Sequence, residues 1–176
     1  MMKESTNKLA VIDLDQTIFF TDNCILKACN MVLGEKLTRE EIRKCPREIK
    51  SLIYDLACTE FINYAKANRT TIKRINSLKK AGYKIVILTG RNKRVEPDTV
   101  AILKKNAVYF DVIYHNPDNS IHDEEFKTKK LSELSLGYDI IEVYEDKIDN
   151  IKYIRDKLRP NNFKFYHVRG NKISKL

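Results

Sequence analysis

The sequence lacks the features that mark several common protein classes. No stretch approaches the roughly 18 consecutive apolar residues that a membrane-spanning helix requires, so we expect no association with membranes. The first eight residues, MMKESTNK, are polar and contain no signal-peptide core, from which we expect an intracellular, cytoplasmic protein. Repeats, low-complexity tracts and Ser/Gly-rich linkers are absent as well. These absences favour one ordinary globular unit.

Cysteine is scarce and placed in a way that does not suggest metal binding. The chain has four cysteines, all in its first third: Cys24, Cys29, Cys45 and Cys58. They form no Cys-x-x-Cys pair, and no histidines cluster as further ligands. We therefore expect reduced thiols packed between helices and no zinc site.

Positive charge is in excess but unevenly distributed. The net charge is +9, and two basic segments, 71–105 and 151–176, flank an acidic segment, 106–150. This pattern has two interpretations. The basic segments could form a face for a polyanion such as nucleic acid, or they could be solvated helix faces.

Short apolar segments alternate with helical patterns along most of the chain. The segments with strand character are Lys8–Asp13, Tyr83–Thr89, Asp111–Tyr114, Ile140–Tyr144 and Phe163–Val168. Between them lie patterns typical of helices, which begin near Thr70, Pro97, Asp123 and Asp149 and end near Gly82, Gly137 and Pro160. The alternation predicts an α/β fold: a three-layer αβα sandwich around a mostly parallel, five-stranded, Rossmann-like sheet.

The stretch from about Thr21 to Ala67 interrupts this alternation with helical sequence only. Thr38 and Glu41 have the spacing of a capping box, and Pro46 stands where a further helix is expected to begin. A simple strand-helix unit does not need so many residues. We therefore predict a core made of residues 1–20 and 68–176, with residues 21–67 as a helical cap insertion.

Polar motifs follow three of the predicted strands. The first strand ends in DLDQT, with Asp13, Asp15 and Thr17. The second ends in LTGR, with Thr89, Gly90 and Arg91, and the fourth ends in YEDKIDN, with Asp146. A lysine-bearing segment, FKTKKL, lies on the helix before the fourth strand and contains Lys127. Ligands of open α/β sheets bind beyond the carboxyl ends of the strands, so these motifs are expected to meet in one crevice.

This set of motifs, in this order, resembles the haloacid dehalogenase-like superfamily of aspartate-nucleophile phosphohydrolases over essentially the whole chain. The resemblance implies that Asp13 attacks phosphorus and forms an aspartyl-phosphate. Asp15 would act as general acid and base, with a pKa raised toward working pH by the neighbouring carboxylate. Thr89 would hydrogen-bond the phosphoryl group, and Lys127 would neutralise charge on Asp13 and the phosphate.

The resemblance also implies a Mg²⁺ cofactor and a set of binding residues. The ligands would be the Asp13 carboxylate, the backbone carbonyl of Asp15, and Asp146. Thr17, Gly90 and Arg91 are the expected substrate-binding residues, although Arg91 could instead pair with an acid. Some assignments stay open at this point: Lys130 is an alternative to Lys127, and the roles of Glu145, Asp149 and Asn150 are not assigned.

The expected function is hydrolysis of a small intracellular phosphomonoester, such as a nucleotide or a sugar phosphate. Two alternatives remain. The basic segments and the LTGR motif are similar to the 3′-phosphatase domains of polynucleotide kinases, which act on nucleic-acid ends. A non-catalytic, polyanion-binding module on the same scaffold is the other. The sequence does not indicate the oligomeric state.

Overall fold

The structure is a computed structural model that describes residues 7–117, 120–159 and 161–176 of the 176-residue chain. Residues 1–6, on which the expectation about a signal peptide mostly rests, and Pro160, an expected helix stop, lie outside these ranges. Within the described residues, no helix combines the length and the apolar character needed to cross a membrane.

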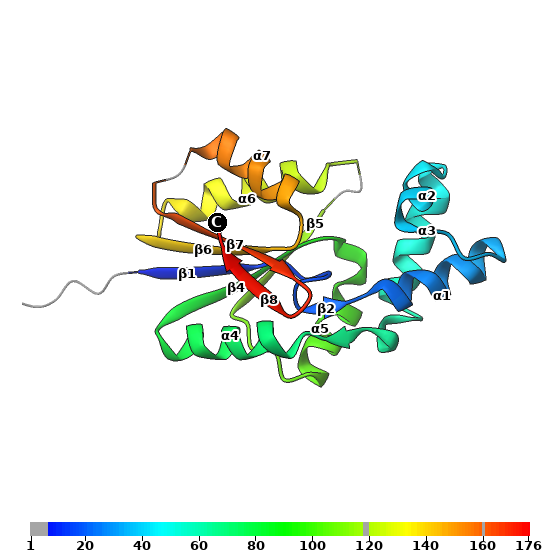
Figure 1. The fold of residues 1–176 in the computed structure, drawn as a ribbon, viewed down its shortest axis with the longest axis horizontal. Coiled ribbons are helices and arrows are strands. Elements are labelled where there is room, and N and C mark those ends of the chain that lie inside the picture. The colour runs from blue at the N-terminus through cyan, green and yellow to red at the C-terminus, as the bar shows by residue number, and fades with distance from the viewer. Residues whose placement is uncertain (1–6, 118–119, 160) are drawn as a thin grey trace, which may run out of the picture.

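The core is a six-stranded sheet with helices on both faces (Figure 1). The strand order is β5-β4-β1-β6-β7-β8. The five predicted strands are present, and the pairs between them are all parallel. They are β1 (Lys8–Ile12), β4 (Tyr83–Asn92), β5 (Val112–Asn116), β6 (Ile140–Glu145) and β7 (Phe163–Arg169). The α/β fold with a mostly parallel central sheet is therefore confirmed.

The sixth strand, β8 (Lys172–Lys175), was not predicted. It pairs antiparallel with β7 across a tight turn, where Gly170 adopts a φ of 57°. The sequence KISK has one apolar residue and lies at the sheet edge, so it carries almost no apolar signal. The sheet thus has six strands and not the expected five.

Alternation of side chains along β1 produces two separate hydrophobic layers. Ala10 and Ile12 point to one face, where α4 (Arg69–Lys80) and α5 (Glu96–Lys105) pack. Leu9 and Val11 point to the other, where α6 (Asp123–Ser135) and α7 (Ile148–Leu158) pack. Because β1 is buried on both faces, its apolar run is continuous, as expected for a central parallel strand.

A helical insert lies between β1 and β3 and projects beyond one end of the sheet (Figure 1). The chain leaves the core through β2 (Phe19–Phe20) and returns through β3 (Lys66–Ala67), and these two short strands pair antiparallel. The insert has its own hydrophobic cluster, which includes Cys24, Cys29 and Ile53. Its elements are α1 (Asp22–Leu33), α2 (Arg39–Lys44), α3 (Arg47–Cys58) and the 3₁₀ helix η1 (Ile62–Tyr64).

Two local expectations for the insert are confirmed. Thr38 and Glu41 form a complete capping box at the start of α2, in which each side chain bonds the other residue's backbone. Pro46 directly precedes α3. Cys24 and Cys29 are buried as free thiols, and the four cysteines form no disulfide.

Candidate active site

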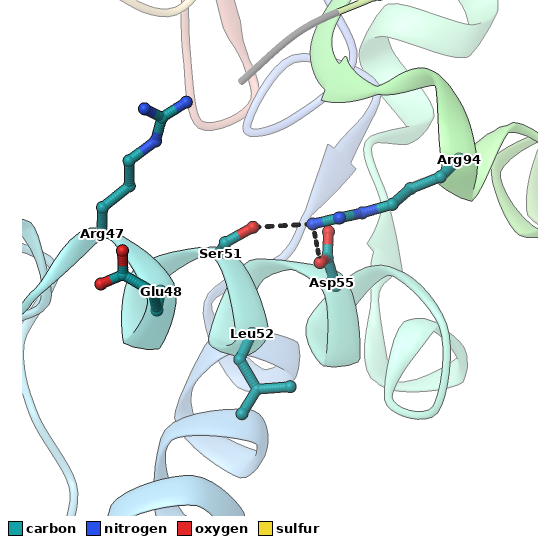
Figure 2. Close-up of a pocket in the computed structure, with 6 residues that line it drawn as sticks. All are labelled: Arg47, Glu48, Ser51, Leu52, Asp55 and Arg94. Carbon is teal, nitrogen blue, oxygen red and sulfur yellow. Dashed lines mark hydrogen bonds and ion pairs between the residues drawn. The ribbon is translucent and has the colours of Figure 1, made fainter. Parts of the chain in front are cut away.

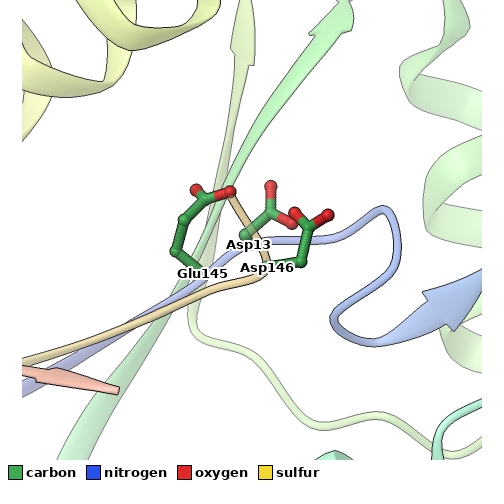
Figure 3. Close-up of side chains that lie close together, drawn as sticks. All are labelled: Asp13, Glu145 and Asp146. Carbon is green, nitrogen blue, oxygen red and sulfur yellow. The ribbon is translucent and has the colours of Figure 1, made fainter. Parts of the chain in front are cut away.

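The carboxyl ends of β1 and β6 bring three acids together. In the parallel register Ile12 lies opposite Tyr144, so that Asp13 follows β1 next to Glu145 and Asp146. Figure 3 shows the three carboxylates turned toward one another. One oxygen from each lies within 4.8 Å of the others. This is the geometry that a single cation can bridge.

Lys127 of α6 connects these acids from the side. Its Nζ donates to Asp13 Oδ1 at 2.7 Å and to Glu145 Oε2 at 2.8 Å, and it lies 3.3 Å from Asp123 Oδ2. The Lys127 side chain is only 4% exposed. Lys130, the alternative, instead pairs with Glu133 on the same helix. Of the two lysines, Lys127 is the one in contact with Asp13.

Asp123 is a member of this cluster that the sequence analysis missed. It accepts hydrogen bonds from Lys147 and Asn150 and pairs with Lys127 one helical turn away. The spacing of four residues from Lys127 was the available signal. We name Asp13, Asp123, Lys127, Glu145 and Asp146 the acidic floor.

The acidic floor has a deficit of positive charge. Burial, together with repulsion from Glu145, raises the pKa of Asp13 to about 7. Burial and the charge of Asp13 likewise raise the pKa of Asp146 to about 6. Burial opposes a charge on Lys127, but Asp13 and Glu145 outweigh it and raise the lysine's pKa. One buried lysine does not balance the surrounding carboxylates.

The donor set fits a hard divalent cation. Asp13 Oδ2 is buried and has no hydrogen-bond partner among the described residues, while Oδ1 is held by Lys127. All three converging groups are carboxylates, the ligand type that Mg²⁺ prefers. Asp13 and Asp146 were predicted as ligands, and Glu145, whose role was left open, lies with them in a group of acids that could hold a metal ion. The contribution expected from the Asp15 carbonyl stays a prediction.

Asp15 behaves differently from the expectation. Arg91 Nε and Nη2 donate to its two oxygens, each at 2.8 Å, in a bidentate pair. Burial opposes ionisation of Asp15, but Arg91 outweighs it and holds the pKa of Asp15 below its usual value. The expectation that a neighbouring carboxylate raises this pKa was therefore wrong, because the dominant neighbour is a cation. Arg91 also donates to Thr99 and is itself buried.

The remaining predicted residues lie beside the site in different ways. A Cβ on Gly90 would lie 2.4 Å from Asp123 Oδ1, so only glycine fits between the LTGR turn and the acidic floor. Thr89 is buried, and its hydroxyl accepts from the backbone N–H of Arg91. Thr17 is fully buried. Among the described residues that line the adjoining cavity, neither Thr17 nor Thr89 appears.

Two residues left open have clear positions. Asn150 is buried and supports Asp123, whereas Asp149 is 97% exposed and lies near Lys152. Asn150 therefore belongs to the surroundings of the acidic floor and Asp149 belongs to the surface.

A cavity of about 620 Å³ lies between the acidic floor and the helical insert. The core contributes Asp13, Asp15, Gly90, Arg91 and Asp146 to its lining. The insert contributes residues of α2 and α3. The two basic segments noted in the sequence contribute little: Arg91 is their only basic side chain among the described lining residues. Their excess charge does not face this site.

Comparisons with known proteins were made by sequence and by structure. No protein-family model and no curated protein matches the sequence. Among solved structures, a predicted phosphatase from Clostridium acetobutylicum is 17% identical, with a TM-score of 0.64; the match covers 92% of this chain and 84% of that one.

Two further structures show the same likeness. A haloacid dehalogenase-superfamily hydrolase, subfamily IA, from Geobacter sulfurreducens is 16% identical, with a TM-score of 0.60; the match covers 91% of this chain and 88% of that one. A chain of the Pnkp1/Rnl/Hen1 complex is 17% identical, with a TM-score of 0.65. That match covers 97% of this chain but 48% of the other, so this chain spans about half the length of that neighbour. The chain therefore has the fold of the haloacid dehalogenase-like hydrolases.

Proposed function

We propose that the chain is a Mg²⁺-dependent phosphomonoesterase that acts through an aspartyl-phosphate at Asp13. The observation that carries this proposal is the environment of Asp13. Its carboxylate is held by the buried Lys127, lies beside Asp146 and Glu145, and borders a cavity large enough for a substrate. A nucleophile, its charge partner and a cation site converge on one point at the strand ends, where α/β folds bind ligands.

In the first step, the Asp13 carboxylate attacks phosphorus. A bond forms between an Asp13 oxygen and phosphorus, the bond from phosphorus to the ester oxygen breaks, and the leaving oxygen takes a proton from Asp15. In the second step, water attacks the aspartyl-phosphate and gives its proton to Asp15. The products are inorganic phosphate and restored Asp13. Lys127 holds the attacking carboxylate in place throughout and offsets its charge.

Asp15 must gain a proton to serve in the first step, although Arg91 keeps it ionised in the structure. We propose that Arg91 turns toward the substrate and thereby allows Asp15 to gain this proton. A phosphate next to Arg91 competes for the guanidinium, which weakens the bidentate pair with Asp15 and raises the pKa of that carboxyl. In this proposal Arg91 both binds substrate and controls the protonation of Asp15.

Asp13, Asp146 and Glu145 would hold Mg²⁺ through their carboxylates, with the Asp15 carbonyl as a further ligand. When bound, the ion neutralises the acidic floor and lowers the barrier for an anionic phosphate to approach Asp13. Thr89 would hydrogen-bond the phosphoryl group, and its hydroxyl also accepts from the backbone N–H of Arg91. Thr17 would contribute to substrate binding; its buried hydroxyl has no hydrogen-bond partner among the described residues.

Small phosphomonoesters, such as nucleotides or sugar phosphates, are the substrates we propose first. Two structural neighbours support nucleic-acid ends as a second substrate class. The first is the Pnkp1/Rnl/Hen1 chain described above. The second, a chain of the Pnkp1/Rnl/Hen1 RNA repair complex, is 18% identical, with a TM-score of 0.59; the match covers 90% of this chain and 42% of that one. At this identity the likeness is one of fold, so substrate class must be tested directly.

The test is hydrolysis of p-nitrophenyl phosphate with and without Mg²⁺. We expect turnover that EDTA abolishes and that Mg²⁺ restores. Asp13→Asn keeps the shape of the side chain and removes the nucleophile, and it should lower kcat by at least about 10³-fold. Asp149→Asn, at the exposed surface, is the matched control and should retain full activity. Undiminished turnover by Asp13→Asn would contradict the proposal.

A further inference from the structure

The wall of the cavity opposite the acidic floor is basic. Arg39 and Arg43 lie one turn apart on α2, and Arg47 and Lys50 lie one turn apart on α3. All four line the same 620 Å³ cavity as Asp13 and Asp146. We name Arg39, Arg43, Arg47 and Lys50 the cap wall.

The charge of the cap wall does not follow from the composition of the insert. Residues 21–67 contain 8 basic and 7 acidic side chains, so the insert as a whole is nearly neutral. Of the four acids on the same two helices, Glu40, Glu41 and Glu48 do not line this cavity, and Asp55 does. The fold therefore directs four of the five cations of α2 and α3, but only one of their four acids, toward the site.

Most of these cations lack an acidic partner. Arg39 pairs with Asp22 at 2.8 Å. Within the part of the chain that the structure describes, Arg43, Arg47 and Lys50 form no salt bridge. Asp55 also lines the cavity, but its carboxylate is taken by Arg94. The cap wall thus presents uncompensated positive charge, whereas the anions of the core are matched by Lys127, by Arg91 and by the proposed cation.

Contacts with the core hold the cap wall in a fixed position over the floor. Arg94, in the 3₁₀ helix η2 (Lys93–Val95), reaches across to α3, where it donates to Ser51 at 2.7 Å and pairs with Asp55 (Figure 2). Ser51 and Asp55 follow Arg47 by four and eight residues and so share its helix face. Figure 2 shows Leu52 pointing to the other side of the helix. The contacts of Arg94 with Ser51 and Asp55 therefore hold the face of α3 that carries Arg47 toward the core.

The α2 side has a comparable anchor. The Asp22 carboxylate that binds Arg39 also accepts from the Gln16 side chain at 3.0 Å. Gln16 belongs to the turn that directly follows Asp15. The position of α2 is thereby linked to the catalytic turn itself.

The cavity is larger than one phosphoryl group requires. A volume of about 620 Å³ lies within the range of sites that enclose whole small ligands. A substrate whose phosphate ester lies at Asp13 extends toward α2 and α3, where the nearest unpaired charges are positive. In a partly enclosed cavity, water and salt screen the mutual repulsion of uncompensated cations less than at an open surface. An anion bound beside these cations relieves that repulsion, so the cap wall favours a second anionic group on the substrate.

We infer that the cap wall binds a second phosphate group of the substrate, with Arg43, Arg47 and Lys50 as the main contacts. This inference rests on the proposed phosphomonoesterase function and specifies its substrate class: a phosphomonoester that carries at least one further phosphate. Two sources share this chemistry, a nucleoside bisphosphate and the end of an oligonucleotide. In both, the cleaved phosphate lies on the acidic floor and the retained phosphate lies at the cap wall.

The experiment compares substrates that differ in the second phosphate. We propose to measure kcat/KM in Mg²⁺ for p-nitrophenyl phosphate, thymidine 3′-phosphate, thymidine 3′,5′-bisphosphate and a short 3′-phosphorylated oligothymidylate. The wild-type protein should favour the bisphosphate over the monophosphate by about tenfold at low salt, and the preference should shrink as salt rises. A further gain for the oligonucleotide would identify a strand as the source, and no gain would identify the small bisphosphate; both outcomes support the cap wall.

Charge reversal at the cap wall is the decisive comparison. Arg43→Glu and Arg47→Glu should each lower kcat/KM for the bisphosphate by about tenfold or more and change that for p-nitrophenyl phosphate by less than about twofold. Lys44→Glu is the matched control, because Lys44 is the exposed neighbour of Arg43 on α2 but does not line the cavity. Equal losses on one-phosphate and two-phosphate substrates, or an equal effect of Lys44→Glu, would overturn the inference.

A binding measurement separates failure of this inference from failure of the proposed function. If none of the four substrates is hydrolysed, the proposed function is wrong. Calorimetric titration of thymidine 3′,5′-bisphosphate into the Asp13→Asn protein then still tests the cap wall without turnover. Weaker binding after Arg43→Glu and Arg47→Glu in this background supports the cap wall, and unchanged affinity, or no binding to the parent protein, overturns it.

Discussion

The acidic floor and the cap wall face the same cavity but are built by opposite means. The floor consists of buried and half-buried charges at strand ends and on α6, where Lys127 bonds Asp13 and Glu145 at distances below 3 Å and lies 3.3 Å from Asp123. The cap wall consists of long, partly exposed cations on two helices, three of which have no acidic partner among the described residues. The charges of the floor therefore interact mainly with one another and stabilise the fold, whereas the charges of the cap wall are available to bind a ligand.

The comparison predicts its largest effect at Lys127. Lys127→Met should lower the free energy of unfolding by about 3–5 kcal/mol, because it leaves Asp13 and Glu145 buried without their cation. Urea denaturation measures the loss. Lys130→Met, on the same helix but more exposed, is the control and should change stability by less than about 0.5 kcal/mol. Similar losses for both variants would show that the floor is not a coupled charge cluster.

A smaller effect is expected from steric crowding of the floor. Gly90→Ala places a methyl group 2.4 Å from Asp123 Oδ1 and 2.8 Å from Asp123 Cγ. Asp123 cannot move freely, because Lys147 and Asn150 hold it. We expect a loss of about 1–3 kcal/mol in the free energy of unfolding and a fall in p-nitrophenyl phosphate turnover. Gly137→Ala has no atom within 4 Å of the added methyl group and should be close to neutral.

The pH dependence of stability should report the ion pairs of Asp123. Burial opposes its charge, but Lys127 and Lys147 outweigh burial and lower its pKa from 3.8 to about 2. A carboxyl with a depressed folded-state pKa contributes stability that is present above 3.8 and lost as the pH falls toward 2. Between pH 6 and pH 3, the wild-type protein should lose about 1 kcal/mol more than Asp123→Asn. If the urea midpoints of the two proteins fall by the same amount between pH 6 and pH 3, the lowered pKa of Asp123 would be contradicted.

The smallest effect on stability is expected at the cap wall. Arg43→Met and Arg47→Met remove exposed cations that form no salt bridge with the described residues, and each should change the free energy of unfolding by less than about 0.5 kcal/mol. The same variants should weaken the use of two-phosphate substrates. A stability loss comparable to that of Lys127→Met would show that the cations of the cap wall, like Lys127 of the acidic floor, stabilise the fold.

Much of the floor could be predicted from the sequence. Asp13 directly follows an apolar run and Asp146 follows one after Glu145, and carboxyl ends of parallel strands meet at one edge, so their convergence follows from the pattern. Lys127 was expected from its place in the FKTKKL motif with Lys130 as the alternative, and the structure places Lys127 in contact with Asp13. The bounds of the helices and of the five apolar strands agree closely with expectation because each has its own periodicity or end signal.

Other features depend on partners that are distant in sequence. Arg91 and Asp15 are 76 residues apart, and no local pattern indicates that they pair. This pair reverses the expected direction of the Asp15 pKa. The edge strand β8 was missed for a related reason: it forms only because β7 offers an open edge, and its own residues are mostly polar.

The order of the elements, the helical insert and the acids at the strand ends could be predicted from the sequence, because they depend on local periodicity and on chain position. Which charges neutralise one another, and which remain exposed to a ligand, depends on how distant segments pack together. The basic segment 71–105 contributes one basic side chain, Arg91, to the described lining of the cavity and segment 151–176 contributes none, whereas a nearly neutral insert supplies the basic wall. Net charge counts side chains, whereas binding depends on the direction in which helix faces and strand ends present them.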